Sequence, residues 1–186
     1  MQEKENVMRI LRETKLALEK GDPIKIKNLS NQTINTASLT QDIDNITVAV
    51  IVYSIGKILE RENYRKLAGW DVFQKVVEVS LTNSIKDIEK NNEKKFRKDL
   101  ESIRTAIGKL SGKLKEYIES VFEKAKINKA SRLYEHGISM EQTAKLLGIS
   151  MYELAEYSGK TGISDVAESK TIGVKDRIKI AMEIFG

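Results

Sequence analysis

The sequence predicts an all-α protein, and three observations support this prediction. A single Pro among 186 residues, together with many Lys, Glu, Ile and Leu, favours helices throughout. Apolar residues recur at helical spacing along most of the chain. Residues 140–159 have the pattern of two short helices joined by a glycine turn. The apolar content of 40% is enough for one sizeable core or two small ones.

The first three helices are expected over residues 3–20, 23–38 and about 42–59. Gly21 ends the first helix, and Asp22-Pro23 is a typical start for the second. The second helix is polar, and its expected anchors are Leu29, Ile34 and Ala37. The third helix is apolar nearly all round over residues 46–59, so we expect it at the centre of a helical bundle.

The next two helices carry longer apolar patterns. A turn around Gly69 precedes a helix that opens at Trp70-Asp71 and turns six apolar residues inwards: Phe73, Val76, Val77, Leu81, Ile85 and Ile88. A long helix is then expected over residues 92–124, with apolar residues spaced alternately by four and three: Phe96, Leu100, Ile103, Ile107, Leu110, Leu114, Tyr117 and Val121. This heptad seam predicts packing against another helix, either within the bundle or in a homodimer.

The C-terminal part is expected to form a helix-turn-helix. A preceding helix covers residues 124–135, Ala144 lies where two helices approach closely, and Gly148 lies in the turn because the turn needs positive φ. Ser150 can cap the second helix. The apolar contacts are expected from Leu147, Ile149, Leu154 and Tyr157. A loop and a final helix over residues 174–185 follow, which gives two units, 1–122 and 123–186.

Charge is unevenly distributed along the chain. The net charge is +5, and residues 86–115 contain ten Lys or Arg but only five Asp or Glu. The ordinary interpretation of such a run is a solvated helix face. The alternative is a stripe that contacts phosphates.

Several kinds of chemistry are not expected from this composition. The absence of Cys excludes disulfides, thiolate metal sites and thiol catalysis. The glycine-lysine stretches 108–113 and 159–161 lack the spacing and the preceding buried strand of a phosphate-binding loop. Arg132 and His136 lie one helical turn apart, as in some helical ribonucleases, but HEPN-type domains place four residues between them and this chain has three. We therefore expect no enzymatic activity, no cofactor and no metal.

The chain also lacks the sequence signals of export and membrane insertion. No N-terminal apolar stretch resembles a signal peptide, and the apolar run 46–55 is too short to span a membrane. A cytoplasmic protein with no membrane partner is the expectation.

Residues 129–159 resemble the helix-turn-helix of small prokaryotic, especially archaeal, antitoxin-like regulators. The shared features are Leu-Tyr-Glu-x-Gly at a helix end, a Ser before the next helix, and Ala-x-Leu-x-Gly-Ile-Ser at the turn. Such regulators often accompany PIN-domain ribonucleases. The N-terminal bundle looks like uncharacterised archaeal helical proteins, to which no activity is attached.

The leading hypothesis is a dimeric helix-turn-helix DNA-binding protein with a role in transcription regulation. Such dimers read two half-sites about 34 Å apart. The second helix is acidic, since Glu153 and Glu156 are expected on its exposed face, so contacts to phosphates are expected rather than base reading. The residues expected to bind nucleic acid are Lys145, Ser150, Tyr152, Lys160, Lys113 and Lys115.

Two other hypotheses remain open. The acidic second helix, which also bears Met151 and Tyr152, could dock a basic protein surface as an antitoxin-like or adaptor module. Alternatively, the basic residues 86–115 could bind the RNA backbone in an RNA- or ribosome-associated factor. The salt dependence of binding separates phosphate contacts from apolar protein docking.

Overall fold

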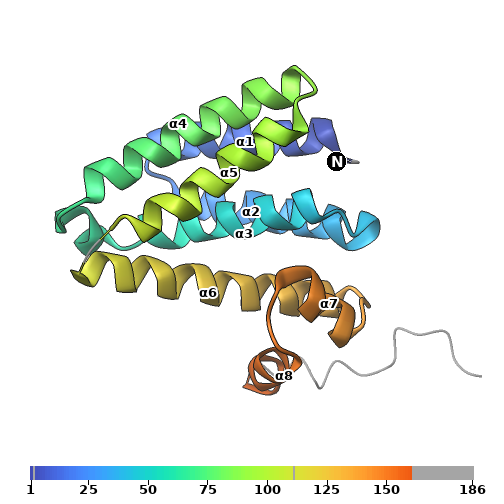
Figure 1. The fold of residues 1–186 in the computed structure, drawn as a ribbon. Coiled ribbons are helices and arrows are strands. Elements are labelled where there is room, and N and C mark those ends of the chain that lie inside the picture. Colours follow the sequence, from blue (N-terminus) through green and yellow to red (C-terminus); the bar gives the residue numbers. More distant parts are fainter. Residues whose placement is uncertain (2, 111, 161–186) are drawn as a thin grey trace, which may run out of the picture.

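The computed structural model describes residues 1, 3–110 and 112–160, and over these residues the only regular elements are helices (Figure 1). This confirms the all-α prediction. The predicted loop after residue 160 and the final helix 174–185 lie outside the described residues. The elements are α1 (Lys4–Glu19), α2 (Pro23–Thr40), α3 (Ile43–Leu59), the 3₁₀ helix η1 (Glu62–Lys66), α4 (Trp70–Glu89), α5 (Glu93–Gly108), α6 (Gly112–Glu135), α7 (Met140–Leu147) and α8 (Met151–Lys160).

The starts of the early helices follow from local capping chemistry. The Asp22 side chain accepts a hydrogen bond from the Lys25 backbone N–H at 2.9 Å, and Pro23 occupies the first turn of α2. Asp42 caps α3 by accepting from the Asp44 N–H at 2.8 Å. These side chains satisfy backbone donors that have no partner within the helix. The predicted bounds of α1 to α4 are therefore confirmed to within a few residues, whereas η1 was not predicted.

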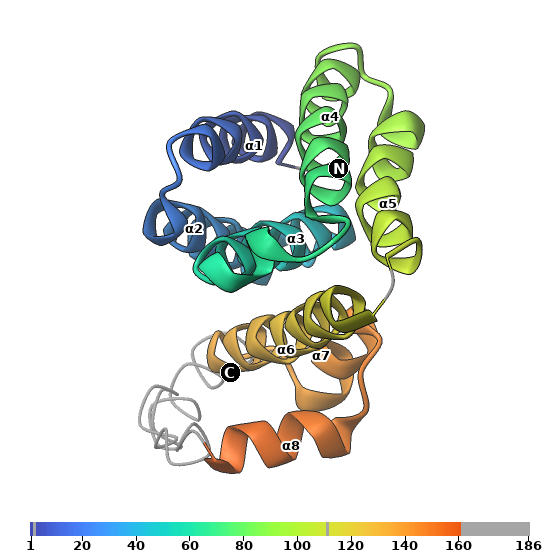
Figure 2. The same ribbon diagram turned by 90° about the vertical axis from the view of Figure 1, so that its left-hand side faces the viewer.

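Helix α3 lies at the centre of the bundle, as its apolar sequence predicts. It contacts α1, α2, α5, α6 and α7, and both faces of its middle section are buried. Figures 1 and 2 show α1, α4 and α5 on one side of α3 and α6 on the other. Its Ile51, Val52 and Ile55 belong to the main hydrophobic core. Among the described residues, no helix combines the length and apolar character needed to cross a membrane.

The single long helix predicted over residues 92–124 is wrong. Helix α5 ends at Gly108, and α6 begins at Gly112, whose φ of +59° is a left-handed conformation that glycine adopts readily. Each glycine inside a helix costs about 1 kcal/mol relative to alanine, and here two lie within five residues. The chain therefore turns at this point, and α6 packs mainly on α3 rather than continuing α5.

The heptad seam is divided between these two helices and buried within one chain. Phe96, Leu100 and Ile103 on α5 and Leu114 and Val121 on α6 all join the main core. Tyr117 is 41% exposed, and the neighbouring Ile118 is buried instead, because the helical register starts afresh after the break. The seam thus finds its partners inside the bundle, which removes the observation that suggested a homodimer. The dimer itself stays a prediction.

A second hydrophobic cluster joins the C-terminal helices to the bundle. It contains Ile34, Ala37, Ile46 and Ala49 from α2 and α3, together with Leu133 and Ile138, and Leu146 and Leu147 of α7 pack against it. The predicted boundary between residues 122 and 123 falls inside α6, which runs without interruption to Glu135. The division into two units stays a prediction, but these units would share apolar packing.

Candidate nucleic-acid interface

Helices α7 and α8 form a tightly capped pair, with bounds close to those predicted. Ser139 caps α7 by accepting from the Gln142 N–H at 3.2 Å. Gly148 follows α7 with φ of +62°, a conformation that would strain any residue with a side chain. At the start of α8, the Ser150 Oγ accepts from the Glu153 N–H at 3.1 Å, and the Glu153 carboxylate accepts from the Ser150 N–H at 2.8 Å. This reciprocal arrangement is a capping box.

Only some of the apolar side chains that were expected to hold this helix pair together are buried. Ala144 and Leu154 are 3% and 0% exposed, as expected. Leu147 and Ile149 are half-buried, which corrects the prediction that they belong to the interior. Leu147 lines an open hollow between α7 and α3, and Ile149 lies in the turn itself, so water reaches one side of each.

The exposed face of α8 is acidic and partly apolar. Tyr152 and Met151 are 77% and 53% exposed, and Glu153, Ala155 and Glu156 are also exposed. The hydrogen bonds from Ser150 lower the pKa of Glu153, so this carboxylate stays ionised. The described part of this face therefore offers negative charge and apolar surface where a recognition helix would meet DNA.

The six residues expected to bind nucleic acid do not form one patch. Lys145, Ser150 and Tyr152 lie together on or beside the α7–α8 turn, but the Ser150 hydroxyl is already engaged in the cap. Lys113 and Lys115 lie at the far end of α6, and Lys115 is 4.0 Å from Glu119. Lys113 lies thirteen positions before Lys126, the residue of α6 that lies beside the α7–α8 turn, which corresponds to about 20 Å along the helix. The side chain of Lys160 lies outside the described part of the chain.

Three cations from different helices meet beside the α7–α8 turn. Arg104 of α5, Lys126 of α6 and Lys145 of α7 line a hollow of about 400 Å³, called here the α7 hollow. Arg104 and Lys126 each pair with an acid on their own helix, Glu101 at 3.2 Å and Glu123 at 2.8 Å. Lys145 forms no ion pair with any residue that the structure describes. The floor of the α7 hollow is apolar and includes Ile46, Val50, Phe122, Leu146 and Leu147.

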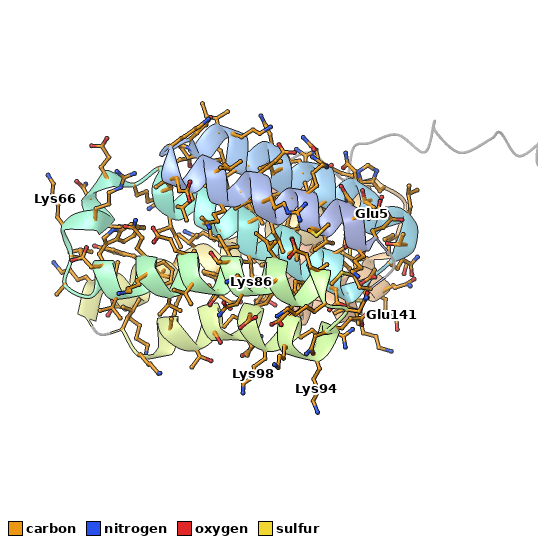
Figure 3. All side chains as sticks on the ribbon, turned by 90° about the horizontal axis from the view of Figure 1, so that it is seen from above. Glu5, Lys66, Lys86, Lys94, Lys98 and Glu141 are labelled. Carbon is orange, nitrogen blue, oxygen red and sulfur yellow. The ribbon has the colours of Figure 1, made fainter. Side chains whose placement is uncertain are left out.

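A second basic region lies on the α4–α5 pair, on the other side of the bundle from α8 (Figures 1 and 2). Figure 3 shows Lys86 on α4, and Lys94 and Lys98 projecting outward from α5. A hollow of about 410 Å³ on this helix pair, called here the α4–α5 hollow, is lined by four lysines: Lys86, Lys90, Lys95 and Lys98. The basic run 86–115 is therefore spread over α4, α5 and α6 rather than along one helical stripe.

Two acidic side chains lie within the α4–α5 hollow. Asp99 is half-buried and lies beside Asp87 in this hollow. Burial, and then this contact with Asp87, raises the pKa of Asp99 to about 6, although Lys95 and Lys98 act in the opposite direction. Sequence reasoning missed this pair, because it depends on how α4 and α5 pack against one another.

A fully buried lysine joins α6 to the bundle. Lys129 is 0% exposed, its Nζ donates to the Asn31 Oδ1 at 2.8 Å, and the same atom lies 4.2 Å from the centre of the Tyr53 ring. Burial, and then the nearby charge of Arg132, lowers the pKa of Lys129 to about 7. The spacing along α6 is the feature of the sequence that could have predicted this burial. Lys129 follows the buried Phe122 and Ala125 by seven and four residues, so it lies on the same face of the helix.

The structure gives Arg132 and His136 separate partners. Arg132 pairs with Glu135 at 2.9 Å, and the Nε2 of His136 lies 2.9 Å from the Asn35 Oδ1. Both contacts are those of polar side chains at the end of a helix. Within the described residues, no group of three or more His, Asp or Glu is arranged to hold a metal ion.

Comparisons with protein-family models, with curated proteins and with solved structures find no match to this chain. The resemblance of residues 129–159 to antitoxin-like regulators therefore stays a prediction.

Proposed function

We propose that the chain is a non-enzymatic helix-turn-helix protein that binds DNA through backbone phosphates, as a regulator of transcription. The observation that carries this proposal is the α7 hollow, where Arg104, Lys126 and Lys145 converge from three helices beside the α7–α8 turn. The ammonium group of lysine and the guanidinium group of arginine displace counterions from DNA phosphates. This displacement supplies essentially all of the affinity of non-specific DNA binding. No Arg, Lys, Asn or Gln lies on the exposed face of α8 over residues 151–159, so direct base reading is not part of the proposal.

The salt dependence of binding tests this proposal. The probe is a labelled DNA duplex of about 30 base pairs, and the test variant carries Arg104→Gln, Lys126→Gln and Lys145→Gln. Each lost cation should reduce the slope of log affinity against log salt by about one unit, so the expected reduction is roughly three. Selection from genomic fragments then asks whether any sequence is preferred.

A matched control separates this local effect from the general loss of charge. Lys20, Lys66 and Lys75 are exposed, and replacing all three by Gln removes the same charge elsewhere on the molecule. The control variant should keep a slope close to that of the parent. Equal slopes for the two triple variants, or a parent that binds no DNA at low salt, would contradict the proposal.

The exposed face of α8 supports a second candidate function, docking to a basic protein surface. Met151 and Tyr152 are large, exposed and adjacent to Glu153 and Glu156, and Tyr and Met are favoured at protein interfaces. Tyr152→Ser should weaken such a complex at least tenfold with little dependence on salt. The same substitution should leave the salt slope of DNA binding unchanged, since it removes no charge.

A further inference from the structure

The four lysines of the α4–α5 hollow gather because of helix spacing and a tight turn. Lys86 and Lys90 are four residues apart on α4 and its end, and Lys95 and Lys98 are three apart on α5, so each pair shares a helical face. Asn91, with φ of +58°, reverses the chain between the helices. The side chain of Asn92 then caps α5 by accepting from the Lys95 N–H at 3.1 Å.

The charge of these lysines is only partly offset by the two acidic residues of the hollow. None of the four forms an ion pair with a described acid, although several exposed lysines elsewhere do. The hollow also holds two carboxyl groups, Asp87 and Asp99, which lie close enough for Asp87 to raise the pKa of Asp99. The four lysines outnumber these two carboxyl groups, so the hollow keeps an excess of positive charge even when both carboxyl groups are ionised.

The chemistry of the lining selects phosphates that are spaced along a chain. Lysine ammonium groups are flexible point charges that bind phosphate oxygens without a fixed geometry. Asn83 lines the same hollow and adds an amide hydrogen-bond donor, whereas the Ser102 hydroxyl already donates to the Lys98 carbonyl at 3.0 Å. The hollow contains no Arg, which would favour bidentate contacts with guanine, and no aromatic ring on which a base could stack.

We propose that the α4–α5 hollow binds the phosphodiester backbone of a nucleic acid without regard to sequence. This site is separate from the α7 hollow and lies on the other side of the bundle from α8 (Figures 1 and 2). The proposal does not depend on DNA binding by the α7–α8 pair. If both sites are occupied, one molecule holds two segments of nucleic acid.

The Asp87–Asp99 pair gives this site a pH dependence that a plain lysine patch lacks. The charged groups that face Asp99 are Asp87 and Lys86 and Lys90 from α4, and Lys95 and Lys98 from its own helix. At pH 7.5 Asp99 is ionised and repels a phosphate, whereas below about pH 6 it is protonated and can donate a hydrogen bond to one. A phosphodiester does not gain a proton in this range, but a phosphate monoester does, since its second pKa is about 6.

The first experiment measures binding of a labelled duplex over a series of salt concentrations. The variant Lys86→Gln, Lys90→Gln, Lys95→Gln and Lys98→Gln should reduce the salt slope by roughly three to four units. A control with Lys15, Lys20, Lys66 and Lys75 replaced by Gln removes equal charge outside the hollow. Melting curves establish that both variants are folded. A slope reduction equal to that of the control would overturn the proposal.

The quadruple substitution is also made in the background of the α7 hollow triple variant. If the α7 proposal fails and this one holds, only the quadruple substitution changes the slope, so the two failures are distinguishable. Duplex DNA and duplex RNA of the same sequence are compared as probes, and the tighter one identifies the natural backbone. Competition by inorganic phosphate as strong, per phosphate, as that by the duplex would overturn the assignment to a nucleic acid.

The second experiment compares pH 7.5 with pH 5.5 at constant ionic strength. In the parent, duplex affinity should rise roughly fivefold at the lower pH, as repulsion by Asp99 is removed. Asp99→Asn should bind at pH 7.5 as the parent does at pH 5.5 and should lose this response. A parent and an Asp99→Asn variant with the same pH response would show that the carboxyl pair does not face the bound phosphates.

Discussion

The α4–α5 and α7–α8 pairs use the same turn chemistry but present opposite surfaces. In each, a residue with positive φ, Asn91 or Gly148, reverses the chain, and a side chain then caps the next helix. The first pair exposes unpaired lysines, whereas the second exposes two glutamates on α8. The α7–α8 pair has the sequence pattern that suggests DNA binding, but the larger group of lysines lies on the α4–α5 pair. The turn residues determine the path of the backbone and do not determine which side chains are exposed on the helices that follow.

The two pairs also differ in how their stability arises. Helices α4 and α5 have 20 and 16 residues, and their contact face contributes to the main core. Helices α7 and α8 have only 8 and 10 residues, a length at which an isolated helix is not stable in water. The second pair therefore depends on a few buried contacts, and it should be the more sensitive to a single substitution.

The largest expected effect comes from Ala144→Glu. This substitution places an unpaired charge where Ala144 is 3% exposed between two short helices, and we expect a loss of about 3 kcal/mol or more in unfolding free energy. Ala155→Glu is the matched control, because Ala155 is exposed on α8 and should change stability by less than about 0.5 kcal/mol. Chemical denaturation of both variants would test this, and equal midpoints would mean that α7 does not pack as described.

The next effect concerns Lys129 and pH. The pKa of Lys129 is about 7 in the folded protein and near 10.5 in the unfolded chain. Between pH 7 and pH 10.5 the Lys129 amine is therefore protonated in the unfolded chain and neutral in the folded protein. The contribution of Lys129 to stability therefore improves as pH rises, by about 1.4 kcal/mol per pH unit in that window, and it is least favourable below about pH 7.

Lys129→Met should remove this dependence. The stability difference between variant and parent should shrink by about 2 kcal/mol between pH 7.5 and pH 9, with the variant the more stable at the lower pH. Lys124→Met, on the exposed side of the same helix, should show no such trend. Denaturation curves over this pH range provide the measurement, and parallel curves for parent and Lys129→Met would mean that the buried amine is charged.

The smallest effect tests the acidic face of α8. Replacing Glu153 and Glu156 by Gln should strengthen nonspecific DNA binding by roughly twofold to fivefold, since repulsion is relieved, while Gln at position 153 can keep the capping box. Replacing the exposed Glu5 and Glu19 on α1 is the control for net charge. If α8 instead docks a basic protein, the double variant weakens that complex and leaves DNA binding unchanged. A double variant that binds no DNA at low salt would count against the DNA proposal.

Local signals in the sequence were sufficient to predict most helices. Asp22-Pro23, Gly69 and Gly148 mark turns through their own backbone chemistry, and the apolar run of α3 indicates a central helix without knowledge of its neighbours. The bounds of α7 and α8 follow from the same kind of signal, with Ser139 and Ser150 as caps. These features depend on residues a few positions apart.

Features that depend on distant packing were missed. The heptad pattern continues through Gly108 and Gly112, so periodicity alone favoured one helix where the chain folds back onto α3. The Asp87–Asp99 contact arises only when α4 and α5 lie side by side. The partners of Lys129 could not be predicted from the sequence, because Asn31 and Tyr53 lie 98 and 76 residues earlier and meet it only in the folded chain.

The continuity of α6 has a consequence for the ancestry of this protein. Helix α7 packs against a cluster that includes Ile34, Ala37, Ile46 and Ala49, which lie in the first third of the chain. A recombination point near residue 122 would cut α6 in the middle and leave these residues exposed to water in the N-terminal product. We therefore expect the bundle and the α7–α8 pair to be inherited together, with substitutions at these positions of α2 and α3 accompanied by compensating changes in α7.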